Sequence, residues 1–187
     1  PVERYFSEAG RLVPKAVTNN AQALAKAESH GYQFRPFACD PHRMMLDEVP
    51  ILHELTLAAF ADNFLFEPLP LSLFRQLYVP LLDKIASVRF SWFALDPLGK
   101  PCGFLFAFED NATLVAKTVG VIPAHRGYSL QMALLQKSLI QAQDEGIETV
   151  VSALLKEGIA SERIPALFAN TGGVLWRHRY VLLEKQL

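Results

Sequence analysis

A short basic turn in the second half of the chain carries the clearest chemical signal in the sequence. It lies within Thr118-Val-Gly-Val-Ile-Pro-Ala-His-Arg-Gly-Tyr-Ser-Leu-Gln and joins a β-branched segment to an amphipathic one. A helix that begins here leaves its first backbone amides without intrahelical partners, beside the positive end of the helix dipole. Such a helix start binds anions, most naturally a phosphate. Arg126 can hold a phosphate through two hydrogen bonds, and Gly127 leaves room for a ligand beside the backbone. The alternative is an ordinary strand-to-helix turn with a surface arginine.

The composition indicates one folded domain with an appendage. The 187 residues are 51% hydrophobic and include 13 Phe, which is ample for a buried core. The net charge of −1 argues against a protein that binds duplex nucleic acid, because such proteins usually present a basic face. No apolar run approaches the roughly 18 residues that span a bilayer. We therefore expect neither nucleic acid nor membrane as a partner.

Cysteine usage and the start of the chain indicate a compartment and an origin. Cys39 and Cys102 lack the spacing of metal ligands and are too few for a disulfide framework. We expect no bound metal and a reduced, cytoplasmic setting. The chain begins with Pro1 and not with Met, and no secretory leader is visible. We interpret it as a fragment of a longer polypeptide.

The elements positioning the turn follow from periodicity and from turn residues. Residues 1–31 are expected to be a helical N-terminal appendage or linker, with a helix over 16–30 that ends at Gly31. Residues 32–187 are expected to form the domain, an α+β fold with a mixed sheet. Its predicted helices cover 47–63, 72–84, 129–145 and 161–170, and its predicted strands cover 32–37, 88–94, 104–108, 114–122, 149–155 and 174–183.

From about Gln33 onward the chain resembles the GNAT acetyltransferase superfamily. The family turn has the form Val-x-Pro-x-x-Arg-Gly-x-Gly-x-Gly, and here it reads Val121-Ile-Pro-Ala-His-Arg-Gly-Tyr-Ser-Leu-Gln. Five further segments are similar to a bacterial subgroup with longer members: Arg35-Pro, Ala59-Phe-Ala-Asp-Asn-Phe, Gly103-Phe-Leu-Phe-Ala, Lys117-Thr and Arg179-Tyr180. The resemblance implies the GNAT acyl-CoA N-acyltransferase fold, in the C-terminal GNAT domain of a longer bacterial protein.

The resemblance also implies a coenzyme and a reaction. The co-substrate would be acetyl-CoA, and the acetyl group would move to an amine of a small molecule or a peptide. A β-bulge would separate the strand of Val119 and Val121 from the next one, so that their backbone bonds the pantetheine arm. The remaining residues implied in coenzyme binding lie in the turn: His125, Arg126, Gly127, Tyr128, Ser129 and Leu130. The apolar link over 64–70 would help to shape the acceptor pocket.

Acetyl transfer to an amine also needs residues that transfer protons. A general base should be a carboxylate beside the separated strands, for which Glu109 and Glu157 are the candidates. The tyrosine and asparagine often found in the family are replaced by Phe168 and Ile159, so water, Tyr128 or Tyr180 would have to serve as the acid. These replacements, with Gln131 at a glycine position, favour the alternative of a non-catalytic acyl-CoA-binding or structural module.

The final strand raises two further expectations. Arg177 and Arg179 should lie on a solvated face, with contact to the CoA ribose phosphate as the alternative. Trp176, His178 and Tyr180 share the opposite face, which we expect to be core. A homodimer is left open, because this strand could pair with a neighbour.

Overall fold

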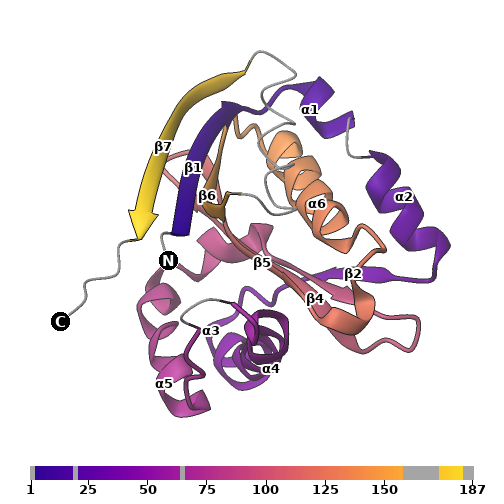
Figure 1. Ribbon diagram of the computed structural model, residues 1–187, viewed down its shortest axis with the longest axis vertical. Coiled ribbons are helices and arrows are strands. Elements are labelled where there is room, and N and C mark those ends of the chain that lie inside the picture. The colour runs from indigo at the N-terminus through magenta and orange to yellow at the C-terminus, as the bar shows by residue number, and fades with distance from the viewer. Residues whose placement is uncertain (1–2, 19–20, 64–65, 158–172, 183–187) are drawn as a thin grey trace.

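A single mixed sheet organises the protein (Figure 1). The computed structural model describes residues 3–18, 21–63, 66–157 and 173–182. The strands lie in the order β2-β3-β4-β5-β6-β1-β7, and all neighbours are antiparallel except β5 and β6, which are parallel. Their bounds are β1 Glu3–Arg11, β2 Gln33–Pro36, β3 Trp92–Leu95, β4 Pro101–Asp110, β5 Thr113–Val121, β6 Thr149–Lys156 and β7 Val174–Leu182.

Helices cover both faces of the sheet. Successive side chains along β4 point to opposite faces, and each face packs against a different set of helices. Leu105 packs in one core with Leu134 and Leu139 of α6, whereas Phe104 and its neighbours pack in a second core with Leu52 of α4. Figure 1 shows α1, α2 and α6 on one side of the sheet and α3, α4 and α5 on the other. The helical bounds are α1 Pro14–Thr18, α2 Ala21–Ser29, α3 Pro41–Arg43, a π-helical turn Met44–Glu48, α4 Val49–Phe60, α5 Leu71–Gln76, 3₁₀ segments Val79–Phe90 and Pro123–His125, and α6 Leu130–Asp144.

The elements in the second half of the chain agree closely with those predicted from the sequence. The hairpin of β3 and β4, the strands β5 and β6, and α6 all lie within a few residues of their predicted bounds. The predicted helix 16–30 is two helices, α1 and α2, and it does end at Gly31, whose φ is 83°. The predicted helices 47–63 and 72–84 change type along their length, with π-helical or 3₁₀ geometry in part of each. The predicted helix 161–170 lies outside the described residues.

The prediction that residues 1–31 form a helical appendage is wrong for its first part. Residues Glu3–Arg11 are strand β1, which pairs with β6 on one side and with β7 on the other. The charged residue Glu8 interrupts the apolar alternation by which a buried strand would be predicted. The side chain of Glu8 is nevertheless 0% exposed, and Nε of Arg177 on β7 donates a hydrogen bond to its Oε2 over 2.5 Å. The sheet of the domain therefore starts at the third residue.

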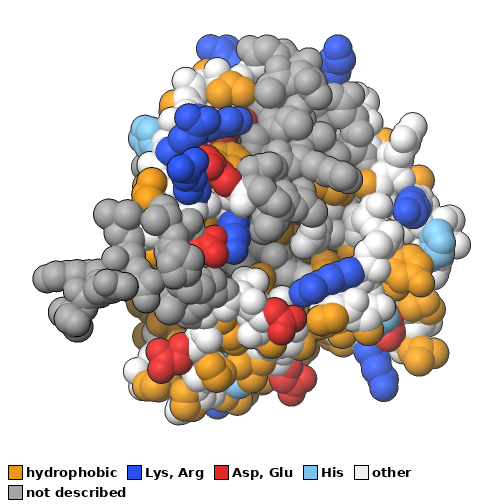
Figure 2. Space-filling view, viewed as in Figure 1, with side chains coloured by type: hydrophobic (Ala, Val, Ile, Leu, Met, Phe, Trp, Pro, Cys, Tyr) orange, Lys and Arg blue, Asp and Glu red, His pale blue; other side chains and the backbone are white. Residues whose placement is uncertain are grey.

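One face of β7 agrees with expectation and the other does not. Arg177 and Arg179 lie on a solvated face as predicted, with side chains 41% and 71% exposed, and each also contacts a carboxylate: Arg177 that of the buried Glu8, and Arg179 that of Glu157, with Nε and Oε1 3.4 Å apart. Figure 2 shows basic and acidic side chains side by side over the part of the molecule where β1 and β7 run. Trp176 and Tyr180, expected in the core, are 39% and 43% exposed. No helix in the described part of the chain is both long enough and apolar enough to cross a bilayer.

Candidate functional site

The parallel strands β5 and β6 separate halfway along their length. Their pairing runs from Thr113 with Thr149 to Ala116 with Ser152, although β5 continues to Val121. On the other side, β5 carries an extra residue, Lys117, because Thr118 pairs with Phe106 whereas Ala116 pairs with Ala107. This β-bulge bends the strand where the pairing to β6 ends. Beyond Ala116 β5 is therefore no longer paired with β6, and the unpaired stretch between the two strands is called the opening below.

Backbone groups of β5 face this opening. The amide of Ile122 donates to the carbonyl of Cys102 on β4 over 3.1 Å. Because backbone groups alternate in direction along an antiparallel pair, those of Thr118 and Gly120 also point to β4. The groups of Val119 and Val121 point the other way, into the opening. The two residues expected to bond a pantetheine arm thus have the required orientation.

The basic turn lies at the end of β5 and leads into α6. The amides of His125 and Arg126 are already bonded, to the carbonyls of Ile122 at 3.0 Å and Pro123 at 3.2 Å. Among the described residues, none accepts a hydrogen bond from the amides of Gly127, Tyr128 or Ser129. The first amides of α6, from Leu130 on, have no preceding turn to bond. The backbone amides without a partner therefore begin at Gly127, two residues after His125.

Gly127 keeps these amides accessible. Its φ is 94°, and a Cβ added to it would meet nothing within 4 Å. The following helix has 15 residues, long enough for its dipole to place partial positive charge on the turn. The backbone at Gly127 is therefore open on the side where a Cβ would stand.

Arg126 has a different role from the one expected of it. Its residue surface is exposed, but the guanidinium bonds two backbone carbonyls, from Nε to Val121 at 3.4 Å and from Nη2 to Ala59 at 3.0 Å. These bonds connect the turn to β5 and to the end of α4. Part of its donor capacity is therefore already used in positioning the turn, which leaves the remaining N–H groups for a phosphate.

An aromatic cluster supports the turn from the side of α2 and β2. The hydroxyl of Tyr32 lies 2.9 Å from Nδ1 of His125, and the rings of Tyr32 and Tyr128 lie 5.2 Å apart. Burial raises the pKa of Tyr32, with smaller contributions from neighbouring groups. Lys26 donates to the carbonyl of Gly127 over 3.3 Å. Lys26 of α2, a helix predicted from the sequence to belong to an appendage, thus helps Tyr32 to hold the basic turn in place.

Two residues stand where the family pattern has glycine. Ser129 has φ 62° and ψ 20°, a left-handed conformation that glycine adopts readily, and its hydroxyl does not cap the helix. The conformation therefore persists without the glycine that normally provides it. Gln131 is half-buried in the first turn of α6, and its side chain bonds none of the described residues.

The candidate proton-transfer residues are not brought together. Glu109 accepts from Nη2 of Arg89 at 2.6 Å, and the same guanidinium donates from Nε to Glu145 at the end of α6. Tyr128 precedes the start of α6, so a helix of 15 residues, about 22 Å long, separates these two regions. Phe168 and Ile159 lie outside the described residues.

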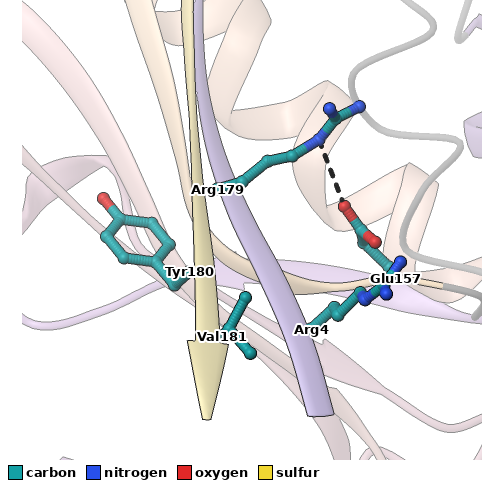
Figure 3. A pocket seen from close by; sticks show the side chains of 5 residues that line it. All are labelled: Arg4, Glu157, Arg179, Tyr180 and Val181. Atoms are coloured by element: carbon teal, nitrogen blue, oxygen red, sulfur yellow. Dashed lines mark ion pairs between the residues drawn. The ribbon is translucent and has the colours of Figure 1, made fainter. Parts of the chain in front are cut away.

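Glu157 lies at the opposite end of β6 from the paired segment. It lines a pocket of about 390 Å³ with Arg4, Arg179, Tyr180 and Val181. Figure 3 shows Arg179 reaching toward Glu157, while Tyr180 projects from the other side of β7. The carboxylate is thus held at the β1–β7 edge.

An aromatic wall that sequence reasoning missed lies behind β5. A Cβ on Gly120 would come within 2.8 Å of Phe104, whose ring lies 6.3 Å from that of Phe60. Phe60 in turn lies 6.4 Å from Phe66, in the link predicted to shape an acceptor pocket. Only the close approach of α4 to Gly120, with Ala59 at 3.2 Å from the same position, brings them together.

Solved structures show what this fold is. The chain is similar to a GCN5-related N-acetyltransferase from Sphaerobacter thermophilus, with a TM-score of 0.66 and 20% identity over 97% of this chain and 52% of that one. It is also similar to the glucosamine N-acetyltransferase region of a fungal multi-domain β-N-acetylglucosaminidase, with a TM-score of 0.62 and 14% identity over 95% of this chain and 20% of that one. L-PGS from Bacillus licheniformis matches with a TM-score of 0.54 and 10% identity, over 96% and 61% of the two chains.

These similarities concern the fold. No family model matches the sequence, and no curated protein matches it. The chain spans about half the length of the Sphaerobacter protein. The protein has a GNAT-like acyltransferase fold, of the α+β class with a mixed central sheet flanked by helices.

Proposed function

We propose that the protein is an acyl-CoA-dependent acyltransferase that moves an acetyl group from acetyl-CoA to an amine. The observation that carries the proposal is the opening between β5 and β6, which leads directly to the free amides of the turn before α6. An extended amide chain ending in a diphosphate matches this arrangement of backbone donors. The GNAT-like fold supports the same interpretation.

The parts of the coenzyme have counterparts in the site. The pantetheine amides would bond the backbone of Val119 and Val121, and the diphosphate would bond the amides from Gly127 to Leu130. Acetyl transfer needs a polarised thioester carbonyl, and a backbone amide in the opening can provide this by hydrogen bonding. Neither contact requires a specific side chain, which is why the departures at Ser129 and Gln131 are compatible with binding.

The amine would approach from the side of the aromatic wall formed by Phe60, Phe66 and Phe104. These rings lie beside Gly120, on the face of β5 opposite to α6. A partly apolar amine is therefore the acceptor class that the site favours. Glu109, Glu157 and Tyr128 remain candidates for proton transfer, and Glu109 would first have to be released from Arg89.

Coenzyme binding is the first test of the proposal. Acetyl-CoA at about a hundred times its dissociation constant should add roughly 2.7 kcal/mol to the free energy of unfolding, measured as a shift in thermal midpoint. Gly127→Asp should reduce affinity for CoA at least tenfold by calorimetry, because a carboxylate would occupy the place of the diphosphate.

A matched control separates this effect from folding. Gly146 also has positive φ, 78°, and equally open surroundings, but it lies at the other end of α6. Gly146→Asp should therefore leave the affinity for CoA unchanged. Equal affinity in both variants, or no thermal shift with the unmodified chain, would contradict the coenzyme site.

The second candidate is a GNAT-like module that binds acyl-CoA without turnover. The strained Ser129 and the side chain of Gln131 in the first turn of α6 favour it. Release of free CoA from acetyl-CoA, followed with a thiol reagent over a panel of amines, separates the two. Binding without amine-dependent release would favour the module, and neither binding nor release would leave a structural domain.

A further inference from the structure

Among the described residues, the sheet ends in an open edge at β7. This strand is the last in the order of strands, and Figure 1 shows no other labelled element beyond it. All nine of its residues are exposed, including Leu175, Trp176, Tyr180 and Val181 at between 39% and 54%. An exposed apolar edge strand is a template for pairing with another strand.

The backbone pattern of β1 determines which groups of β7 point outward. The amide of Arg11 bonds the carbonyl of Gly173, next to β7, whereas Leu12 bonds Glu148, on the side of β6. By alternation, Ser7 and Tyr5 face β7, and they are opposite His178 and Tyr180. The amides and carbonyls of Arg177, Arg179 and Val181 must therefore point to the free edge. A bulge at Leu175 limits this regular stretch to Trp176–Leu182.

The sequence of β7 is a chemical palindrome about His178. It reads Val-Leu-Trp-Arg-His-Arg-Tyr-Val-Leu over Val174–Leu182. In an antiparallel pair of two copies centred on His178, each Trp176 stands opposite Tyr180 of the other copy. Each Arg177 stands opposite Arg179, and these are the residues whose backbone groups point outward. Sequence symmetry and backbone direction thus select the same register.

The charges of the palindrome do not oppose this pairing. Two arginines opposite each other would repel. Here the charge of each arginine is neutralised within its own copy, because Arg177 bonds the buried Glu8 and Arg179 lies beside Glu157. The aromatic side chains meet on the other face, where Trp176 already stacks on His178 with ring centroids 4.7 Å apart.

From these observations we infer that two copies of this chain pair through β7, antiparallel and centred on His178, to form one continuous sheet. The Arg177–Arg179 pairs exchange main-chain hydrogen bonds, and Trp176 packs on Tyr180 of the second copy at the closer, non-hydrogen-bonded positions. Trp176 and Arg177 of the second copy then lie beside the pocket of Arg4, Glu157 and Tyr180 shown in Figure 3. The pairing does not depend on the proposed acyl transfer.

Two double variants with the same number of substitutions test the register. The unmodified chain should have twice its mass of 20.9 kDa by light scattering at high concentration and dissociate on dilution. W176K/Y180E places Lys opposite Glu in both copies and should remain a dimer. W176K/Y180K places Lys opposite Lys and should be a monomer, with the thermal midpoint showing that both variants fold.

Cross-linking tests the centre of the pairing. With the exposed Cys39 replaced by alanine, His178→Cys brings two thiols together, because directly opposite residues at such a position lie about 4.5 Å apart at Cα. Oxidised glutathione, which takes up the two electrons, should convert this variant to a disulfide dimer. Leu182→Cys in the same background stands opposite Val174 and should stay uncross-linked.

Each other result overturns the inference. A monomer at every concentration shows that β7 does not pair copies of this chain. A dimer in both double variants shows that another surface is used. Monomers in both, or equal cross-linking of the two cysteine variants, exclude the register centred on His178.

Discussion

Ser129 is the residue at which the anion-binding turn departs most from an unstrained backbone. A non-glycine residue in the left-handed region costs about 1–2 kcal/mol, less the entropy that glycine loses on folding. Ser129→Gly should therefore raise the free energy of unfolding by about 0.5–1 kcal/mol, measured by thermal or urea denaturation. Ser129→Ala should change it by only a few tenths, because the hydroxyl forms no helix cap. A lower stability for the glycine variant would contradict this reading of the turn.

Between elements, Arg89 connects three segments that are far apart in sequence. It belongs to the 3₁₀ segment before β3 and bonds Glu109 of β4 and Glu145 after α6, each at 2.6 Å. Burial acts to raise the pKa of Glu145, but hydrogen bonds from Gln141 and Arg89 outweigh it and lower the pKa below 4.5. A carboxylate whose pKa is lowered by folding stabilises the protein above its unfolded pKa.

The stabilisation by Glu145 should therefore disappear in acid. Glu145→Gln should lower the free energy of unfolding at pH 7 by about 1 kcal/mol or less, as for other exposed ion pairs. The difference from the unmodified chain should shrink as pH falls below 4.5, through the lowered pKa. Urea titrations at a series of pH values measure it.

For the whole molecule, β1 joins the two ends of the chain. Glu8 is fully buried between β6 and β7, and Arg177 contacts its carboxylate across 169 positions of sequence. Arg177→Ala should destabilise the protein by about 3 kcal/mol, because it leaves the buried carboxylate of Glu8 without its partner. Lys156→Ala, which removes the partner of the more exposed Glu3 on the same strand, should cost at most about 1 kcal/mol.

A double variant distinguishes the ion pair from a general loss of packing. Arg177→Ala with Glu8→Ala should be more stable than Arg177→Ala alone, because no unpaired buried charge remains. Chemical denaturation provides the comparison. If the destabilisation of the double variant equals the sum of the two single ones, the side chains of Glu8 and Arg177 are not coupled. The ion pair would then not stabilise the position of β1.

Local signals in the sequence were sufficient for the elements around the basic turn. Alternation predicted β4 and β5, the helical period predicted α6, and Gly127 with Pro123 located the turn between them. Each of these features depends on neighbours within one element, so a single sequence contains the information. The separation of β5 from β6 could be predicted only from the resemblance to a family, because the side chains of Val119 to Val121 give no sign of it.

What the amino-acid sequence could not determine alone depends on partners distant in the chain. Glu8 is compatible with a buried strand only because Arg177 folds against it, and Glu109 looks like a free base until Arg89 is placed beside it. The sequence determined the strands from β2 to β7, the helix α6, the turn before it and the palindrome of β7, but not β1. The tertiary structure decided which charges are neutralised and which strand edge is left open, because a charge or an amide is free only if nothing distant in the chain has bonded it.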